Sequence, residues 1–166
     1  EKRPITFYLT VMSLDEISIN SSGDVEAGDL TAQDFKIELA SSGDLKLGSL
    51  ECDSLLAHVY SSGDASLAGL NAGSIIVNLL SSGDLQILGG QVDEQDLTLT
   101  SSGNYEAREL SSARVRASLS SSGSATIRVS DSLNGNISSS GDINYFGDPS
   151  VDVDASSSGD VNQIDD

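Results

Sequence analysis

The sequence is poor in cysteine, proline, aromatic residues and basic residues, and each shortage excludes a class of protein. There is one Cys, Cys52, so neither an internal disulfide nor a multi-cysteine metal site is possible. Eight Lys+Arg against 26 Asp+Glu give a formal net charge of −18. Nucleic-acid binding depends on clustered Lys and Arg, so this charge excludes it. No apolar run approaches the ~20 residues of a transmembrane segment.

What is present is an aliphatic and serine-rich composition. Nearly one residue in five is serine, and 37% of the residues are hydrophobic although only 4% are aromatic. An acidic, serine-rich chain is typical of disorder, but these aliphatic residues are enough to build a core. The 166 residues suffice for one domain, expected over 1–166. The chain begins at Glu1 without Met or signal peptide, so we expect a processed or excised piece of a longer protein.

An internal repeat is the strongest signal. The tripeptide Ser-Ser-Gly recurs at a spacing of 20 residues, falling to 18 in the last two repeats. Its glycines are Gly23, Gly43, Gly63, Gly83, Gly103, Gly123, Gly141 and Gly159. Asp follows the glycine in six repeats, with Asn104 and Ser124 in the other two. Such a period indicates a repeat architecture with one structural unit per repeat.

Hydrophobic residues alternate within each repeat. Numbered from the glycine as zero, positions +2, +4, +14 and +16 are mostly apolar, as is +7 in most repeats. This period of two is the period of a β-strand. Because the alternation continues through Ser-Ser-Gly, we interpret that tripeptide as a bend in an extended run. Glycine suits the bend because it tolerates positive φ and a close backbone approach.

These observations predict an all-β, single-stranded, right-handed parallel β-helix of about eight coils of 18–20 residues. We interpret the N-terminal apolar residues as one more coil that lacks the motif and has no cap. These residues are Ile5, Phe7, Leu9 and Val11, followed by Ile17 and Ile19. The alternative is a sandwich or barrel of hairpins. Hairpins favour Asn-Gly or Asp-Gly turns, and Asn134-Gly135 is the one such dipeptide.

The start of the chain resembles the opening of the repeat array in the putative auto-transporter adhesin, head GIN domain family. The matching segments are 2–11 (KRPITFYLTV) and 14–25 (LDEISINSSGDV). The similarity extends over essentially all of 1–166. It implies an exported β-helical domain of unknown function, in the cell envelope or at the surface of a Gram-negative bacterium. Since family members usually have a further N-terminal segment, it also implies that residues 1–166 are the C-terminal part of a longer exported protein. The family provides no catalytic residues to transfer to this chain. Asn104 and Ser124 depart from its Asp, which argues against a strict chemical role for that position.

Candidate chemistry is scarce. The stacked Asp residues could hold calcium, but we expect them to hydrogen-bond the backbone at each bend, with no metal or cofactor. Stacked inward serine hydroxyls are expected to bond one another or the backbone. His58 is the single histidine, and no nucleophile-elbow or zinc-protease motif accompanies it. We therefore predict a non-enzymatic protein, the alternative being a polysaccharide-cleaving β-helix enzyme.

The outward positions hold one unusual group. We expect an apolar patch with a polar rim on the outer face, and such a patch often marks a contact surface. Its residues are Leu56, His58, Tyr60, Ile76 and Leu80. We predict that this patch packs on a missing N-terminal segment or on a second copy, and that the protein as a whole has a glycan or a surface protein as its partner. If the register were off by one residue, these side chains would instead be core.

Charged residues in two later repeats should pair across strands. Glu94 should face Arg114, and Asp96 should face Arg116. Arg108 and Arg128 share position +5, where we expect them to offset nearby carboxylates, the alternative being contact with acidic glycans. Together, the sequence predicts an exported surface solenoid that serves adhesion, assembly or glycan contact.

Overall fold

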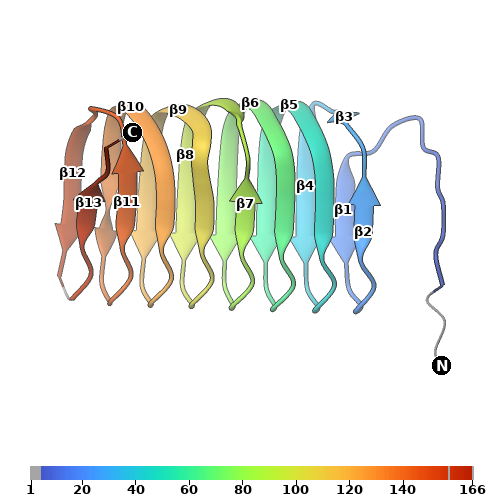
Figure 1. Ribbon diagram of the computed structural model, residues 1–166, viewed down its shortest axis with the longest axis horizontal. Helices are drawn as coiled ribbons and strands as arrows, with labels where there is room; N and C mark the ends of the chain where they lie inside the picture. The colour runs from blue at the N-terminus through green and yellow to red at the C-terminus, as the bar shows by residue number, and fades with distance from the viewer. Residues whose placement is uncertain (1–4, 157, 166) are drawn as a thin grey trace.

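The computed structural model describes residues 5–156 and 158–165, and it forms a parallel β-solenoid of about seven turns (Figure 1). Every strand pair is parallel, and the described residues contain no helix. No helix that could cross a membrane is therefore found in this part of the chain. The strands are β1 (Glu16–Ile19), β2 (Val25–Ala27), β3 (Leu30–Thr31), β4 (Asp34–Leu39), β5 (Leu45–Val59), β6 (Ala65–Leu79), β7 (Leu85–Ile87), β8 (Gly90–Leu99), β9 (Tyr105–Leu119), β10 (Ala125–Ile137), β11 (Ile143–Phe146), β12 (Ser150–Ala155) and β13 (Val161–Gln163).

One repeat makes one coil, as predicted. Ala57 pairs with Ile37 behind it and with Val77 ahead of it, a constant step of 20 residues. The step falls from 20 to 18 within the pairing of β9 and β10, where Ala125 pairs with Tyr105 but Leu133 pairs with Val115, and it stays 18 where Ala125 pairs with Ile143. As the chain advances from right to left in Figure 1, near strands rise and far strands descend, so the coil is right-handed.

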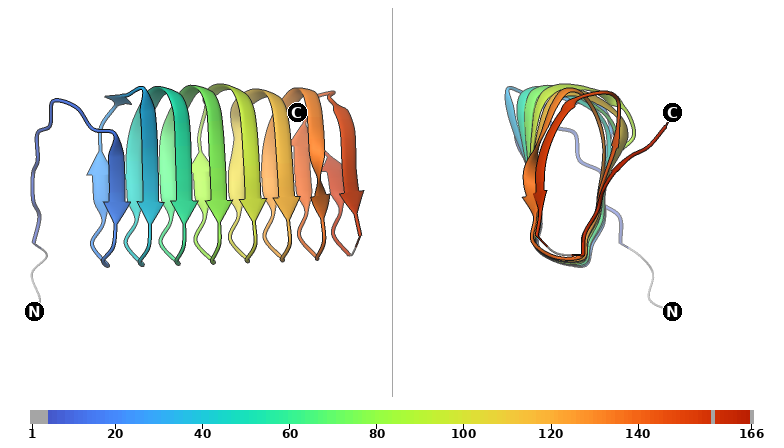
Figure 2. Two further views of the ribbon diagram at one scale, coloured as in Figure 1. Left: turned by 180° about the vertical axis from the view of Figure 1, so that it is seen from behind. Right: turned by 90° about the vertical axis from the view of Figure 1, so that its left-hand side faces the viewer.

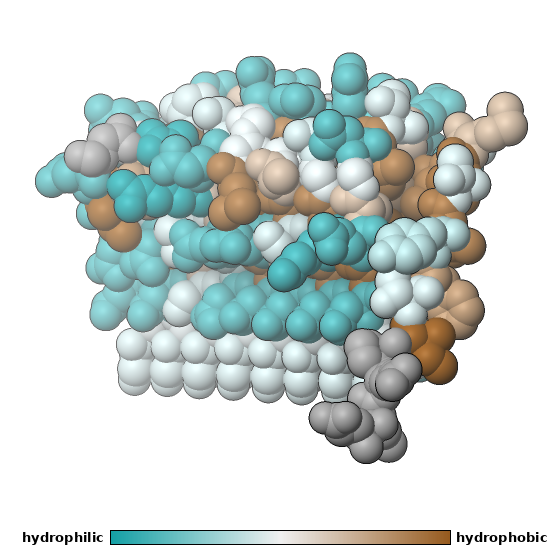
Figure 3. Space-filling model, turned by 45° about the vertical axis from the view of Figure 1, so that its right-hand side comes forward, coloured by the Kyte–Doolittle hydropathy of each residue, from teal (hydrophilic) through white to brown (hydrophobic). Residues whose placement is uncertain are grey.

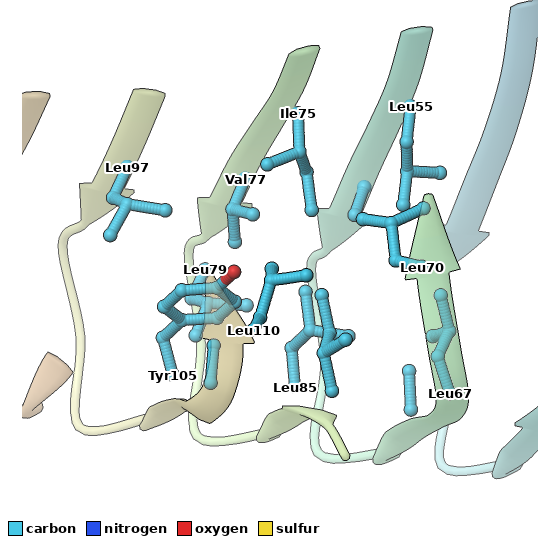
Figure 4. Close-up of a cluster of buried hydrophobic side chains, with 14 of the residues drawn as sticks. Leu55, Leu67, Leu70, Ile75, Val77, Leu79, Leu85, Leu97, Tyr105 and Leu110 are labelled. Carbon is cyan, nitrogen blue, oxygen red and sulfur yellow. The ribbon is translucent and has the colours of Figure 1, made fainter. Parts of the chain in front are cut away.

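Each coil has a rising flank (positions +2 to +5) and a falling flank (positions +11 to +17), with a broad turn between them (Figure 2). Side chains of both flanks, such as Val77 and Leu85, point into one shared core (Figure 4). These two residues are fully buried, as are their equivalents along most of the solenoid. Cys52 lies at the edge of this core, where burial first and nearby Asp53 second raise the pKa of its thiol to about 11.

The Ser-Ser-Gly corners stack in line along one edge of the solenoid, seen as regular pale rows in Figure 3. The backbone N–H of Gly83 donates to the carbonyl oxygen of Ser61 at 3.0 Å, one coil earlier. A Cβ on Gly83 would overlap the carbonyl oxygen of Gly63 and lie 2.7 Å from that of Ser61. Close backbone approach therefore explains the glycine, as predicted.

Our other reason for the corner glycine was wrong. Among the described glycines, positive φ occurs at Gly90 and Gly147, and neither is in a corner. The corner bends without entering the left-handed region, so packing between coils excludes a side chain there.

The prediction of a complete extra coil at the N-terminus was also wrong. Ile17 and Ile19 are buried in β1, but Ile5 and Leu9 are 81% and 86% exposed and belong to no strand. Leu9 and Val11 fall at +6 and +8 of the 20-residue register, and these positions are exposed in the next coil, at Asp29 and Thr31. The alternation from 5 to 11 thus fits a straight strand better than a bent coil.

Candidate functional site: an outer patch on the falling flank

The predicted outer patch (Leu56, His58, Tyr60, Ile76 and Leu80) lies on the falling flank, the side nearer the viewer in the left view of Figure 2. Leu56 pairs with Ile76 across adjacent coils. Tyr60, Ile76 and Leu80 are 45%, 47% and 42% exposed. These side chains therefore point outward, which excludes the alternative that they form core. Their role in binding stays a prediction.

Two aromatic rings form a flat step within the patch. The His58 and Tyr60 rings stack at 10° with centroids 5.4 Å apart. They align because residues two apart in a strand point to the same side. The Nδ1 atom of His58 is covered and has no hydrogen-bond partner in the described part of the chain. The patch therefore combines a planar aromatic surface with aliphatic neighbours.

Ion pairs border the patch on both sides along the axis. On one side, Lys36 Nζ lies 2.6 Å from Glu38 and 3.0 Å from Glu16. Hydrogen bonds to Glu38 first, and to Glu16 second, raise the pKa of Lys36. The pair Leu56–Ile76 separates this cluster from the acidic and basic residues of later coils.

The ion pairs on the other side are the two predicted from the sequence. Arg114 lies 2.7 Å from Glu94, and Arg116 lies 3.9 Å from Asp96. Hydrogen bonding to Glu94 raises the pKa of Arg114 above its ordinary value. A shallow pocket of about 310 Å³ runs over these residues and shares Ile76 with the patch. Exposed pairs of this kind contribute little stability, because water and salt screen them.

The Asp column joins neighbouring coils by hydrogen bonds. Oδ1 of Asp64 accepts a bond from the backbone N–H of Asp84, one coil further along, at 2.9 Å. The Asp side chain thus bonds the backbone at a bend, as predicted, but the bend is that of the next coil. Asn104 behaves alike, since its amide oxygen accepts from the N–H of Ser124 at 3.1 Å. Among the described residues, no three His, Cys, Asp or Glu are grouped to hold a metal.

The two arginines at position +5 cover an aromatic ring. The guanidinium carbons of Arg108 and Arg128 lie 4.5 and 5.3 Å from the centroid of Phe146, which is 2% exposed. Such stacking combines a cation–π attraction with burial of the ring. Arg108 also lies 3.5 Å from Glu109. These arginines thus help to close the C-terminal coils, a role that the sequence analysis did not foresee.

A buried polar pair was missed altogether. The hydroxyl of Tyr105 donates to Oε1 of Gln95 at 2.9 Å, and both residues are almost fully buried. Burial raises the pKa of Tyr105, while Nε2 of Gln95 has no partner in the described structure. The available signal was a polar residue at an inward position, where neighbouring coils have Ile75 and Val115.

Comparison with known proteins identifies the family. The family model described as "Putative auto-transporter adhesin, head GIN domain" matches residues 1–149. The chain belongs to this family. The resemblance predicted from the sequence is thereby confirmed. A search of curated proteins finds no match.

Solved structures share the fold of this GIN-domain protein. A "Putative lipid binding protein" from Parabacteroides distasonis is 25% identical with a TM-score of 0.72, covering 91% of this chain and 62% of that one. A "putative adhesin" from Bacteroides fragilis is 25% identical with a TM-score of 0.61, covering 91% and 61%. A "putative adhesin" from P. distasonis is 21% identical with a TM-score of 0.69, covering 90% and 60%. The chain thus spans about three fifths of the length of these proteins.

Proposed function

We propose that this chain is an exported, non-enzymatic surface solenoid that contacts glycans through the outer patch. Membership of an adhesin-like family supports a surface location. We infer a glycan ligand from the flat His58–Tyr60 step, which has exposed Ile76 and Leu80 beside it. Flat aromatic and aliphatic surfaces pack against the apolar faces of sugar rings. The charged groups around them offer hydrogen bonds to hydroxyl groups.

The size of the patch favours a small ligand. Adjacent coils are ~4.8 Å apart and outward side chains recur every ~6.8 Å, so two coils present about 200 Å². A stable protein interface takes about 800 Å² from each partner. The patch alone therefore suits one or two sugar rings better than a folded protein. On an exposed surface each contact is weak, and useful adhesion would come from many copies acting together.

The polysaccharide-cleaving alternative has no support in the geometry. Two pockets in the described structure are shallow, and their acids lie in ion pairs or at exposed positions. His58 stacks on Tyr60 and hydrogen-bonds to no nucleophile in the described structure. A general acid or base needs such a partner or a substrate cleft in place.

A glycan array probed with the whole chain tests the proposal. We expect binding to a subset of neutral or basic glycans, reduced at least tenfold by Tyr60→Ala. Leu88→Ala is the matched control, because Leu88 is 53% exposed on the opposite flank. Equal binding by both variants, or no glycan binding at all, would overturn the proposal. Phospholipid vesicles serve as a parallel arm, and Tyr60-dependent vesicle binding without glycan binding would assign a lipid ligand instead.

A further inference from the structure

The N-terminal end of the solenoid is an open strand edge. In the described structure, β2 pairs with β5 and has no strand on its other side. The N–H of Val25 donates to the carbonyl of Asp44 at 2.8 Å, so it points toward the next coil. Successive backbone groups of a strand point to opposite sides, so the N–H and C=O of Glu26 are directed to the open end. Such an edge is a template for another strand.

The core is also incompletely covered at this end. Val25, Ala27 and Leu30 are half-buried, whereas their equivalents in the next coil are buried. Those equivalents are Leu45, Leu47 and Leu50. One further strand over β2 would bury the first two of these apolar side chains.

The register places a particular segment on this edge. Glu16 in β1 pairs with Lys36, so the step of 20 residues already holds in the first coil. The same step taken back from Val25–Ala27 arrives at Ile5–Phe7. This tripeptide has the apolar–polar–apolar pattern of β2, and its two apolar side chains are both 81% exposed. The chain from Phe7 to Glu16 is as long as the chain from Ala27 to Lys36.

We propose that Ile5–Phe7 closes onto β2 as a parallel three-residue strand and caps the N-terminal edge. The structure holds this segment open, beside the first coil but unpaired (Figure 1). Strands of three residues already occur at β7 and β13. The strand stops there because Leu9 and Val11 would face solvent. The chain's own segment is favoured over a second copy, since a short tether gives it a millimolar effective concentration.

A pair of engineered cysteines tests closure without removing the apolar side chains. Thr6→Cys with Glu26→Cys, in a Cys52→Ala background, places two thiols on paired residues. In the closed form their Cα atoms are ~4.8 Å apart, within disulfide range. We expect rapid oxidation to a cross-linked monomer. Tyr8→Cys with Glu26→Cys is the control, since those Cα atoms are then ~8 Å apart. It should oxidise at least tenfold more slowly.

Other outcomes would overturn the proposal. Cross-linked dimers would assign the edge to a second copy. Equal oxidation rates for both cysteine pairs would show that Ile5–Phe7 has no fixed register on β2. An unoxidised pair would show that it stays open. Hydrogen exchange of the unmodified chain gives an independent measurement. The Glu26 amide should exchange several-fold faster after Phe7→Ser, with no change at Val25, whose amide bonds to Asp44. Equal exchange at Glu26 in both proteins would contradict closure.

Discussion

At the scale of single residues, the residue after each corner glycine acts as a hydrogen-bond acceptor. Asp64 and Asn104 accept the same bond from the next coil, one through a carboxylate and the other through an amide. The column therefore needs an oxygen at that point and not a negative charge. Neighbouring carboxylates ~4.8 Å apart in water repel by about 0.9 kcal/mol, so the charge brings no advantage.

Asp64→Asn should change the free energy of unfolding by less than about 0.5 kcal/mol, because the amide oxygen keeps the bond. Asp64→Ala should lower it by about 0.5–1.5 kcal/mol, because the N–H of Asp84 loses its acceptor. Urea titration of both variants measures the difference. Addition of calcium should leave the melting temperature unchanged, and a rise of many degrees would reveal a metal site after all.

The phenol of Tyr105 makes the fold sensitive to alkaline pH. Burial raises its pKa, so the folded chain keeps it neutral while the unfolded chain ionises near pH 10. The stability from this difference is complete below pH 10 and is lost as the pH rises further. The loss should approach about 1.4 kcal/mol per pH unit.

Tyr105→Phe should remove this loss, although it lowers stability at neutral pH by leaving Gln95 without its partner. The comparison belongs in a Cys52→Ala background, because the pKa of that thiol is also raised. Urea titrations at several pH values between about 9 and 11 measure the slope. Parallel slopes for the two proteins would refute the assignment to Tyr105.

At the scale of elements, the corners set the distance between coils. Each corner glycine after the first lies over the carbonyl groups of the preceding corner, as Gly83 does over Gly63 and Ser61. Gly23 belongs to the first corner, and a Cβ there would meet one side-chain oxygen at 3.7 Å. The requirement for glycine thus arises from the stacking of one corner on another, and not from the bend itself.

Gly83→Ala should lower the free energy of unfolding by about 1–3 kcal/mol or more, because the added methyl group overlaps backbone. Gly28→Ala is the matched control, since a Cβ there meets nothing within 4 Å. Its effect should stay within about 0.5 kcal/mol. Thermal melts of both variants give the comparison. Similar losses would mean that glycine is required for backbone freedom at both sites.

The elements were predictable where one residue type repeats in one position. The 20-residue step gave the parallel pairing, the outward patch, and the ion pairs Glu94–Arg114 and Asp96–Arg116. Prediction failed where the chain departs from its period. Ile5 and Leu9 alternate as a strand does, but periodicity alone does not distinguish a straight strand from a bent coil. The Phe146 stack depends on three side chains from three coils.

At the scale of the whole molecule, the solenoid is a strongly acidic rod. Its formal charge is −18, and it is built around a continuous aliphatic core. Hydrophilic side chains cover much of the face seen in Figure 3. The compact state holds these charges closer together than the unfolded chain does, so self-repulsion opposes folding.

The melting temperature should therefore rise by several degrees between about 10 and 300 mM NaCl at neutral pH, because salt screens this repulsion. The same titration near the isoelectric pH of about 4.1 is the control, and it should show little rise. Differential scanning calorimetry measures both. A melting temperature that falls with salt at neutral pH would mean that attractive ion pairs outweigh the repulsion.

The constant step between coils also bears on how such a chain changes length in evolution. Duplication or loss of one 20-residue unit between Gly23 and Gly123 leaves every remaining coil paired as before. The gene can thus lengthen or shorten the rod by whole units without a new core. The 18-residue coils have a smaller circumference, so a 20-residue unit inserted among them would not match its neighbours. Exchange of 20-residue units is therefore tolerated between Gly23 and Gly123, whereas exchange among the last coils requires units of 18 residues.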